Sequence, residues 1–97
     1  MKLPEYKIEL KPLSVEASKM MGFKWAGSEI GKRSKLGGAP DYLQPHHTPT
    51  CDACGEQMSF LCQLDSVGDD IVFADVGMVY VFICFDCFEV KAFVQSG

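Results

Sequence analysis

The chain has 97 residues and a formal net charge of −4, with 47% hydrophobic and 23% charged residues. These proportions exclude disordered, coiled-coil and collagen-like chains, and the length predicts a single small domain over residues 1–97. The longest uncharged apolar stretch, Val76–Phe85, is too short for a membrane span, and the first twenty residues hold no secretory signal, so we expect a cytoplasmic protein.

The N-terminal part predicts a strand followed by a short helix. Residues 5–10 alternate apolar and charged side chains, which is the period-two pattern of a half-buried strand. Residues 14–21 predict a helix with Ser14 as its N-cap, and Gly22 is the residue that ends it.

Residues 22–50 predict a long connection, because glycine and proline recur throughout them. A loop of this length in so small a domain is often functional. Gly37 and Gly38 are expected to supply positive φ or a close approach of the backbone. Four apolar side chains are predicted to hold the loop to the core: Trp25, Leu36, Tyr42 and Leu43.

From residue 57 onward the pattern is strongly β. Strands are predicted at residues 57–64, 71–74, 78–85 and 89–95, and the third is apolar on both faces, as in a central strand. The first of these strands should bury one face made of Met58, Phe60, Cys62 and Leu64. The last should place Val90, Ala92 and Val94 on one face. We therefore expect a mainly β fold with an antiparallel sheet, and a small α+β fold is the alternative.

Two Cys-x-x-Cys pairs carry the clearest chemistry. The pair Cys51–Cys54 and the pair Cys84–Cys87 are separated by 29 residues. Each pair is expected to form a tight turn, called a knuckle, that places its two sulfurs on one side. Gly55 directly follows Cys54, where a knuckle commonly needs positive φ. Zinc prefers four tetrahedral ligands and binds thiolate well, so two such knuckles at strand ends predict one structural Zn²⁺ in a zinc-ribbon-like site. The spacer exceeds the typical length of about 15–20 residues, which predicts an extra hairpin within it.

Other readings of the cysteines and histidines remain open. The fifth cysteine, Cys62, is expected to pack against apolar neighbours. His46 or His47 can replace a cysteine as ligand, although exposed loop positions are favoured. A thiol-disulfide oxidoreductase using one Cys-x-x-Cys pair is the alternative function, but such pairs open a helix after a strand, and strands surround these.

The charge is unevenly distributed. Residues 1–48 carry a net +3 and residues 49–97, which hold every cysteine, carry a net −7. Nucleic-acid binders concentrate positive charge on their binding face, so a nucleic-acid-binding ribbon is the less favoured alternative and a basic protein partner is favoured. A nucleic-acid-binding ribbon would use the basic residues Lys32, Arg33 and Lys35 of this chain. The acidic residues of the C-terminal half are expected on a solvated face: Asp65, Asp69, Asp70 and Asp75.

Three stretches together carry a resemblance: Ser34–Gln44 (SKLGGAPDYLQ), Cys51–Leu64 (CDACGEQMSFLCQL) and Tyr80–Cys87 (YVFICFDC). Their order and spacing resemble the YwqG-like family of bacterial proteins and the related region of programmed cell death protein two and its ribosome-assembly relatives. The chain is shorter than typical members, and Tyr42 stands where they often have Trp. The resemblance implies a β-rich, non-enzymatic module and, for the eukaryotic relatives, a chaperone-like role in holding a ribosomal protein.

The expected function is therefore protein binding by a structural-zinc module, in a chaperone-like or immunity-like role. The loop residues expected to shape the binding surface are Gly37, Gly38, Pro40, Tyr42 and Trp25. The partner and the oligomeric state stay open, although an edge strand at 5–10 or 89–95 can pair with another copy.

Overall fold

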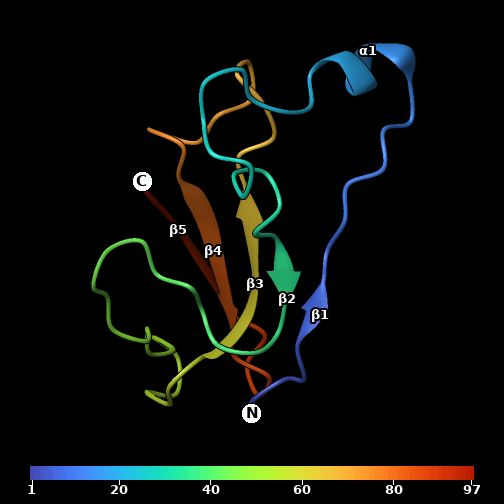
Figure 1. Ribbon diagram of the computed structural model, residues 1–97. Helices are drawn as coiled ribbons and strands as arrows, with labels where there is room; N and C mark the ends of the chain where they lie inside the picture. Colours follow the sequence, from blue (N-terminus) through green and yellow to red (C-terminus); the bar gives the residue numbers. More distant parts are fainter.

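The computed structural model describes residues 1–97 and contains one antiparallel sheet in the order β1-β2-β3-β4-β5 (Figure 1). The elements are β1 Tyr6–Lys7, α1 Val15–Lys19, β2 Lys35–Leu36, β3 Ser59–Asp65, β4 Met78–Ile83 and β5 Val90–Gln95. Each strand pairs with the next one along the chain, and the predicted mainly β, antiparallel class is confirmed. None of the helical structure has the length and apolar character needed to cross a membrane.

β1 is much shorter than the strand predicted at its position, because its partner β2 is only two residues long. β2 ends where Gly37 and Gly38 follow with φ of +76° and +70° and turn the chain out of the sheet. Their N–H groups donate to the carbonyls of Leu61 (2.8 Å) and Leu3 (2.9 Å), and a Cβ on Gly37 would collide with the carbonyl oxygen of Pro4. The predicted positive φ and close backbone approach are both confirmed.

α1 lies where the sequence predicts a helix but is shorter. Ser14 Oγ accepts a hydrogen bond from the Ala17 N–H at 3.0 Å, which confirms the N-cap. The helix ends at Lys19, and Gly22 redirects the chain with a φ of +89°. No residue of α1 is buried, so tertiary packing does not extend it.

A β-bulge in β3 changes which side chains of that strand are buried. The pairing of β3 with β4 shifts between Phe60 and Cys62, and the side chains beyond this point switch faces. Leu64, predicted to share the buried face of Phe60, is therefore 39% exposed, whereas Gln63 and Asp65 are buried. The predicted face is right before the bulge and wrong after it.

The strand predicted at residues 71–74 is wrong, and so is the extra hairpin predicted in the cysteine spacer. Ile71 N–H donates to the Gly68 carbonyl at 3.0 Å and closes a tight turn. Ala74 and Val76 have φ of 55° and 44°, a conformation that strands do not adopt. The added length of the spacer is therefore an irregular loop between β3 and β4.

The core lies on the face of the sheet that the segment 38–50 covers; we call it the inner face. Its centre is β4, where Met78, Tyr80 and Phe82 are almost fully buried. Tyr42 and Leu43 pack against this cluster, as predicted. The other members of the core cluster are Cys51, Met58, Phe60 and Cys84.

Trp25 does not hold the loop to the core, contrary to the prediction. Its side chain is 67% exposed, and its aromatic contact is the ring of Phe23, with centroids 6.3 Å apart. The chain around Trp25 lies near α1 (Figure 1), at the end of the sheet opposite the two cysteine pairs. Beside Trp25, the Lys24 N–H donates to Asp69 Oδ2 at 3.3 Å.

Asp65 forms a buried ion pair with Arg33 and does not lie on a solvated acidic face. Arg33 Nη2 donates to Asp65 Oδ1 at 2.8 Å, and Asp65 Oδ2 accepts from Arg33 Nε (2.9 Å) and from the N–H groups of Gly31 (2.7 Å) and Arg33 (3.0 Å). The Asp65 side chain is 1% exposed and that of Arg33 is 20% exposed. The carboxylate therefore satisfies two backbone donors and one guanidinium, which fastens the segment 31–33 to the end of β3.

This arrangement controls the protonation of Asp65. Burial by itself would raise the pKa of Asp65, but the Arg33 side chain and the N–H groups of Arg33 and Gly31 lower it below its ordinary value. The unfolded-state pKa is about 3.9, so the stability that the pair contributes is fully present above that pH. It is lost as the pH falls through the lower pKa of the folded state.

We expect the free energy of unfolding of the wild type to converge toward that of Asp65→Asn below about pH 4. Urea denaturation of both proteins from neutral pH downward measures the difference. Because Asp65→Asn leaves the rest of the chain unchanged, other acid effects on stability are shared by both proteins and cancel in the difference. A difference that stays constant down to about pH 2 would contradict the lowered pKa of Asp65.

Polar side chains on the inner face hold the covering segment in place, and the sequence did not point to them. Tyr80 Oη donates to the Asp41 carbonyl (2.8 Å) and accepts from the Leu43 N–H (3.1 Å). Gln63 Oε1 accepts from the Asp41 N–H at 3.0 Å, and Gln95 Oε1 accepts from the Leu43 N–H at 2.9 Å. Side chains of three neighbouring strands thus hydrogen-bond to the backbone of residues 41–43.

Candidate metal centre

The first knuckle precedes β3 and is a tight turn closed by two backbone hydrogen bonds. Gly55 N–H donates to the Cys51 carbonyl at 2.8 Å, and Cys51 N–H donates to the Glu56 carbonyl at 2.8 Å. Gly55 has a φ of +77°, as predicted. Cys51 is buried at the base of the turn and Cys54 is exposed at its tip.

The second knuckle connects β4 to β5 and repeats this geometry. Phe88 N–H donates to the Cys84 carbonyl at 2.7 Å, and Cys84 N–H donates to the Glu89 carbonyl at 2.9 Å. Phe88 occupies the position that glycine has in the first knuckle and has a φ of 58°. Cys84 is buried and Cys87 is exposed. The shared spacing Cys-x-x-Cys-x-Glu was a signal for this positive φ that the sequence analysis missed.

The two knuckles bring four sulfur atoms together. The Sγ atoms of Cys51, Cys54, Cys84 and Cys87 all lie within 4.8 Å of one another. Cys54 Sγ and Cys84 Sγ are 3.8 Å apart, and a tetrahedron with Zn–S distances of about 2.3 Å has edges of about 3.8 Å. All four cysteines are free of disulfide bonds. The cluster can hold a metal ion, and its sulfur ligands suit zinc.

The proximity of the thiols changes how they hold protons. Backbone N–H groups of Cys87 and Asp86 lower the pKa of Cys84 below its ordinary value. The hydrogen bond with Cys54, followed by desolvation and contact with Cys51, raises the pKa of Cys87 to about 12. Four adjacent thiolates repel one another, and a divalent cation removes that repulsion. Metal binding must therefore release protons, and metal affinity rises with pH.

The two histidines that could replace a cysteine do not join this cluster, and neither does the fifth cysteine. His46 lies against Phe93, with ring centroids 4.0 Å apart, and also contacts the ring of Tyr42. His47 is exposed. Cys62 is half-buried in β3 and belongs to the opposite face of the sheet. The cluster consists of the two Cys-x-x-Cys pairs alone.

Substitutions at the equivalent positions Gly55 and Phe88 are expected to change the free energy of unfolding in opposite directions. Gly55→Ala meets open space, so its cost comes from positive φ and is expected to be at least about 1 kcal/mol. Phe88→Gly relieves the same strain at a side chain that is 69% exposed, and we expect stabilisation of less than about 1 kcal/mol. Denaturant unfolding of the metal-loaded variants measures both. Changes of the same sign would show that the knuckles are not equivalent.

Two of the three residues of the predicted basic cluster, Arg33 and Lys35, are paired with acids. Arg33 is engaged by Asp65. Lys35 Nζ lies 2.6 Å from Glu5 Oε1 and 3.0 Å from Asp41 Oδ2. Within the predicted basic cluster, only the exposed Lys32 therefore lies outside these ion pairs.

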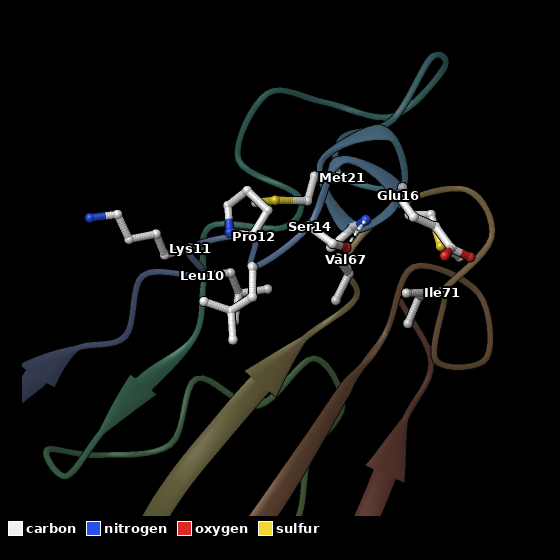
Figure 2. Close-up of a pocket in the computed structure, with 11 residues that line it drawn as sticks. Leu10, Lys11, Pro12, Ser14, Glu16, Met21, Val67 and Ile71 are labelled. Carbon is white, nitrogen blue, oxygen red and sulfur yellow. Dashed lines mark hydrogen bonds between the residues drawn. The ribbon is translucent and has the colours of Figure 1, made fainter.

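A separate apolar groove of about 450 Å³ lies at the α1 end of the sheet. Figure 2 shows Leu10 and Pro12 on one side of it, Met21 beside α1, and Val67 and Ile71 below. None of the predicted site residues lines it, and no group of catalytic or metal-binding side chains converges on it. The groove is therefore distinct from the cysteine cluster in position and in chemistry.

Two matched knuckles, joined by antiparallel strands around four cysteines, define a zinc-ribbon-like β protein with a cluster able to bind a metal ion. The chain belongs to the family described as programmed cell death protein 2, N-terminal domain, whose model matches residues 20–95. This confirms that part of the resemblance. The resemblance to the YwqG-like family is not confirmed by these matches and stays a prediction.

A curated relative gives a second comparison. Over 54 residues the chain is 41% identical to the uncharacterized protein YpfL of Salmonella typhimurium strain LT2. The match covers 56% of this chain and only 13% of that protein. No solved structure matches.

Proposed function

We propose that this chain is a structural-zinc module that binds a basic polypeptide at its knuckle end. The observation that carries the proposal is the pair of knuckles, whose four sulfurs lie within 4.8 Å of one another. Four thiolates around one Zn²⁺ leave no open position for a substrate or a water molecule, so the metal would stabilise the fold. Zinc as the metal and all four cysteines as its ligands are part of the proposal.

The charge around the knuckles supports a basic partner. Four acids belong to the two knuckle segments: Asp52, Glu56, Asp86 and Glu89. One base opposes them, because Lys91 Nζ lies 2.9 Å from Asp52 Oδ1. A Zn²⁺ with four thiolates adds a further net charge of about −2. The resulting field attracts cationic chains and is screened by salt.

The alternative functions have less support. Neither Cys-x-x-Cys pair opens a helix, since α1 is the only α-helix, and thioredoxin-type dithiols depend on that placement. Arg33 and Lys35, which a nucleic-acid-binding ribbon would use, are paired with carboxylates. A chaperone-like or immunity-like role is compatible with an acidic docking end, and the resemblance to ribosome-assembly proteins favours the former.

The metal part of the proposal is tested by native mass spectrometry of protein purified without chelator or added metal. We expect the mass of the chain plus one zinc. A metal-free mass that is lower by two or four hydrogens would show disulfide bonds and would overturn the structural-zinc proposal in favour of the oxidoreductase.

The binding part is tested with a lysine- and arginine-rich peptide as the probe, by fluorescence anisotropy at several salt concentrations. Glu56→Gln with Asp86→Asn removes two exposed knuckle charges and is expected to weaken binding at least about tenfold at low salt. The matched control, Asp70→Asn with Asp75→Asn, removes two exposed charges from the loop between β3 and β4. Equal weakening by both pairs would show only a net-charge effect and would overturn the knuckle end as the docking site.

A further inference from the structure

The face of the sheet opposite the core, which we call the outer face, is apolar on every strand. Its apolar side chains follow from the strand register: Tyr6, Leu36, Cys62, Leu64, Val79, Val81, Ile83, Val90, Ala92 and Val94. Ser59, the register partner of Ile83 at the start of β3, is the polar residue on this face. One complete row crosses all five strands, from Tyr6 through Leu36, Cys62 and Val81 to Ala92. No charged side chain interrupts these rows.

This face is open to solvent. Val90 and Val94 of β5 are 54% and 52% exposed, and Tyr6 at the other edge is 59% exposed. The inner face, by contrast, is covered by the segment 38–50, whose Tyr42 and Leu43 pack on the core. The sheet thus resembles one half of a β-sandwich, in which each sheet buries an apolar face against another sheet.

The size of the outer face matches a small but specific interface. Three strands of six residues cover about 300 Å² at the usual strand spacing and rise, and β1 and β2 extend this area. An exposed apolar patch of a few hundred Å² marks an interaction site. Burying it in two copies would remove on the order of 1,000 Å² of accessible surface, which is near the lower limit for a specific dimer.

The distribution of charge decides what fits this face. The outer face carries no charged side chain. The one charge beside it is the N-terminal ammonium, which donates to Ser59 Oγ at 2.9 Å, so the face offers no acidic group to select the basic partner proposed for the knuckle end. The exposed acids lie beyond its two ends, such as Asp86 in the second knuckle and Asp70 and Asp75 in the loop between β3 and β4. A second sheet of the same apolar composition can approach it without placing like charges against each other, and another copy of the chain offers such a sheet.

We propose that the outer face is a homodimer interface, in which two copies stack sheet on sheet around a two-fold axis. The interface is isologous, so each apolar row meets a row of the same surface in the partner. The valines of β4 lie near its centre, those of the edge strand β5 lie along one side, and Tyr6 of β1 lies at the opposite rim. Its small area makes the dimer weak, with dissociation in the micromolar range or above.

The proposal is tested by sedimentation velocity of the zinc-loaded chain, from low micromolar to several hundred micromolar concentration. The wild type is expected to pass from monomer to dimer across this range. Val94→Lys places a charge in the interface and is expected to raise the dissociation constant at least about tenfold. The matched control is Val15→Lys, the same change at a residue of α1 that is 73% exposed and outside the outer face, and it should leave the dimer intact.

Circular dichroism and the thermal midpoint establish that each variant is folded, and Val90→Lys replaces Val94→Lys if the latter does not fold. A wild type that stays monomeric at the highest concentration would overturn the proposal. If that monomer also bound a hydrophobic dye that Val94→Lys released, the face would belong to a different apolar partner. A dimer that Val15→Lys weakens as much as Val94→Lys would place the interface elsewhere.

Discussion

Chelating the zinc that we propose at the knuckles is expected to lower the thermal midpoint of unfolding by more than about 20 °C. Structural zinc sites contribute on the order of 10–16 kcal/mol of binding free energy in zinc-finger peptides. A small domain has a total stability of only about 5–15 kcal/mol. Because Cys51 and Cys84 belong to the hydrophobic core cluster, loss of the metal would open the core itself and not only the knuckle tips.

Thermal unfolding followed by near-ultraviolet circular dichroism measures this effect, because Tyr80 and Phe82 lie in the same core. Cys84→Ser should reproduce the effect of the chelator and prevent stoichiometric zinc binding. Cys62→Ser is the matched control, since Cys62 lies outside the sulfur cluster and is half-buried, and it should retain zinc. An unchanged midpoint after complete removal of the metal would show that the sheet is stable without it.

Replacing Arg33 with Met is expected to cost about 3–5 kcal/mol of the free energy of unfolding. The change removes the two side-chain donors that neutralise Asp65, whose side chain is 1% exposed, and leaves a buried charge without its cation. It also removes the hydrogen bond from Arg33 Nη2 to the Val76 carbonyl at 2.9 Å. Urea denaturation of the zinc-loaded protein measures the loss.

The neighbouring strand supplies the control for this change. Lys35→Met removes a cation whose partners, Glu5 and Asp41, have mostly exposed carboxylates, so we expect a loss of less than about 1 kcal/mol. The double variant Arg33→Met with Asp65→Leu should recover part of the loss, but not all, because the N–H groups of Gly31 and Arg33 keep no acceptor. A cost for Arg33→Met as small as that for Lys35→Met would contradict the buried pair.

Local spacing was enough to predict much of the candidate metal centre. The two Cys-x-x-Cys pairs lie at strand ends, and antiparallel strands bring such ends together, so the clustering of four sulfurs was predictable from the sequence. Gly55 was also predictable, because positive φ after the second cysteine is a local requirement. Phe88 was missed because a bulky residue hides the same requirement in the second knuckle.

The features that the sequence did not predict depend on contacts between distant residues. Arg33, the partner of Asp65, is 32 residues away along the chain. Considered separately in the sequence, each residue is expected to be a charged side chain exposed to solvent. Gln63 is buried after the bulge, where it satisfies Asp41, and nothing in its own segment indicates that role. Trp25 was expected in the core on hydrophobicity alone, and the structure leaves it 67% exposed.

The sequence by itself determined the β class, the positions of the three long strands along the chain and the residues whose sulfurs cluster, because these follow from side-chain periodicity and from short ligand spacing. Only the tertiary structure decided which face of the sheet is covered. Both faces of β4 are apolar, and the segment 38–50 lies across one of them because Gln63, Tyr80 and Gln95 hold its backbone there. The hydrogen bonds that hold the segment 38–50 all lie on the inner face, and on the outer face Val90 and Val94 stay 54% and 52% exposed.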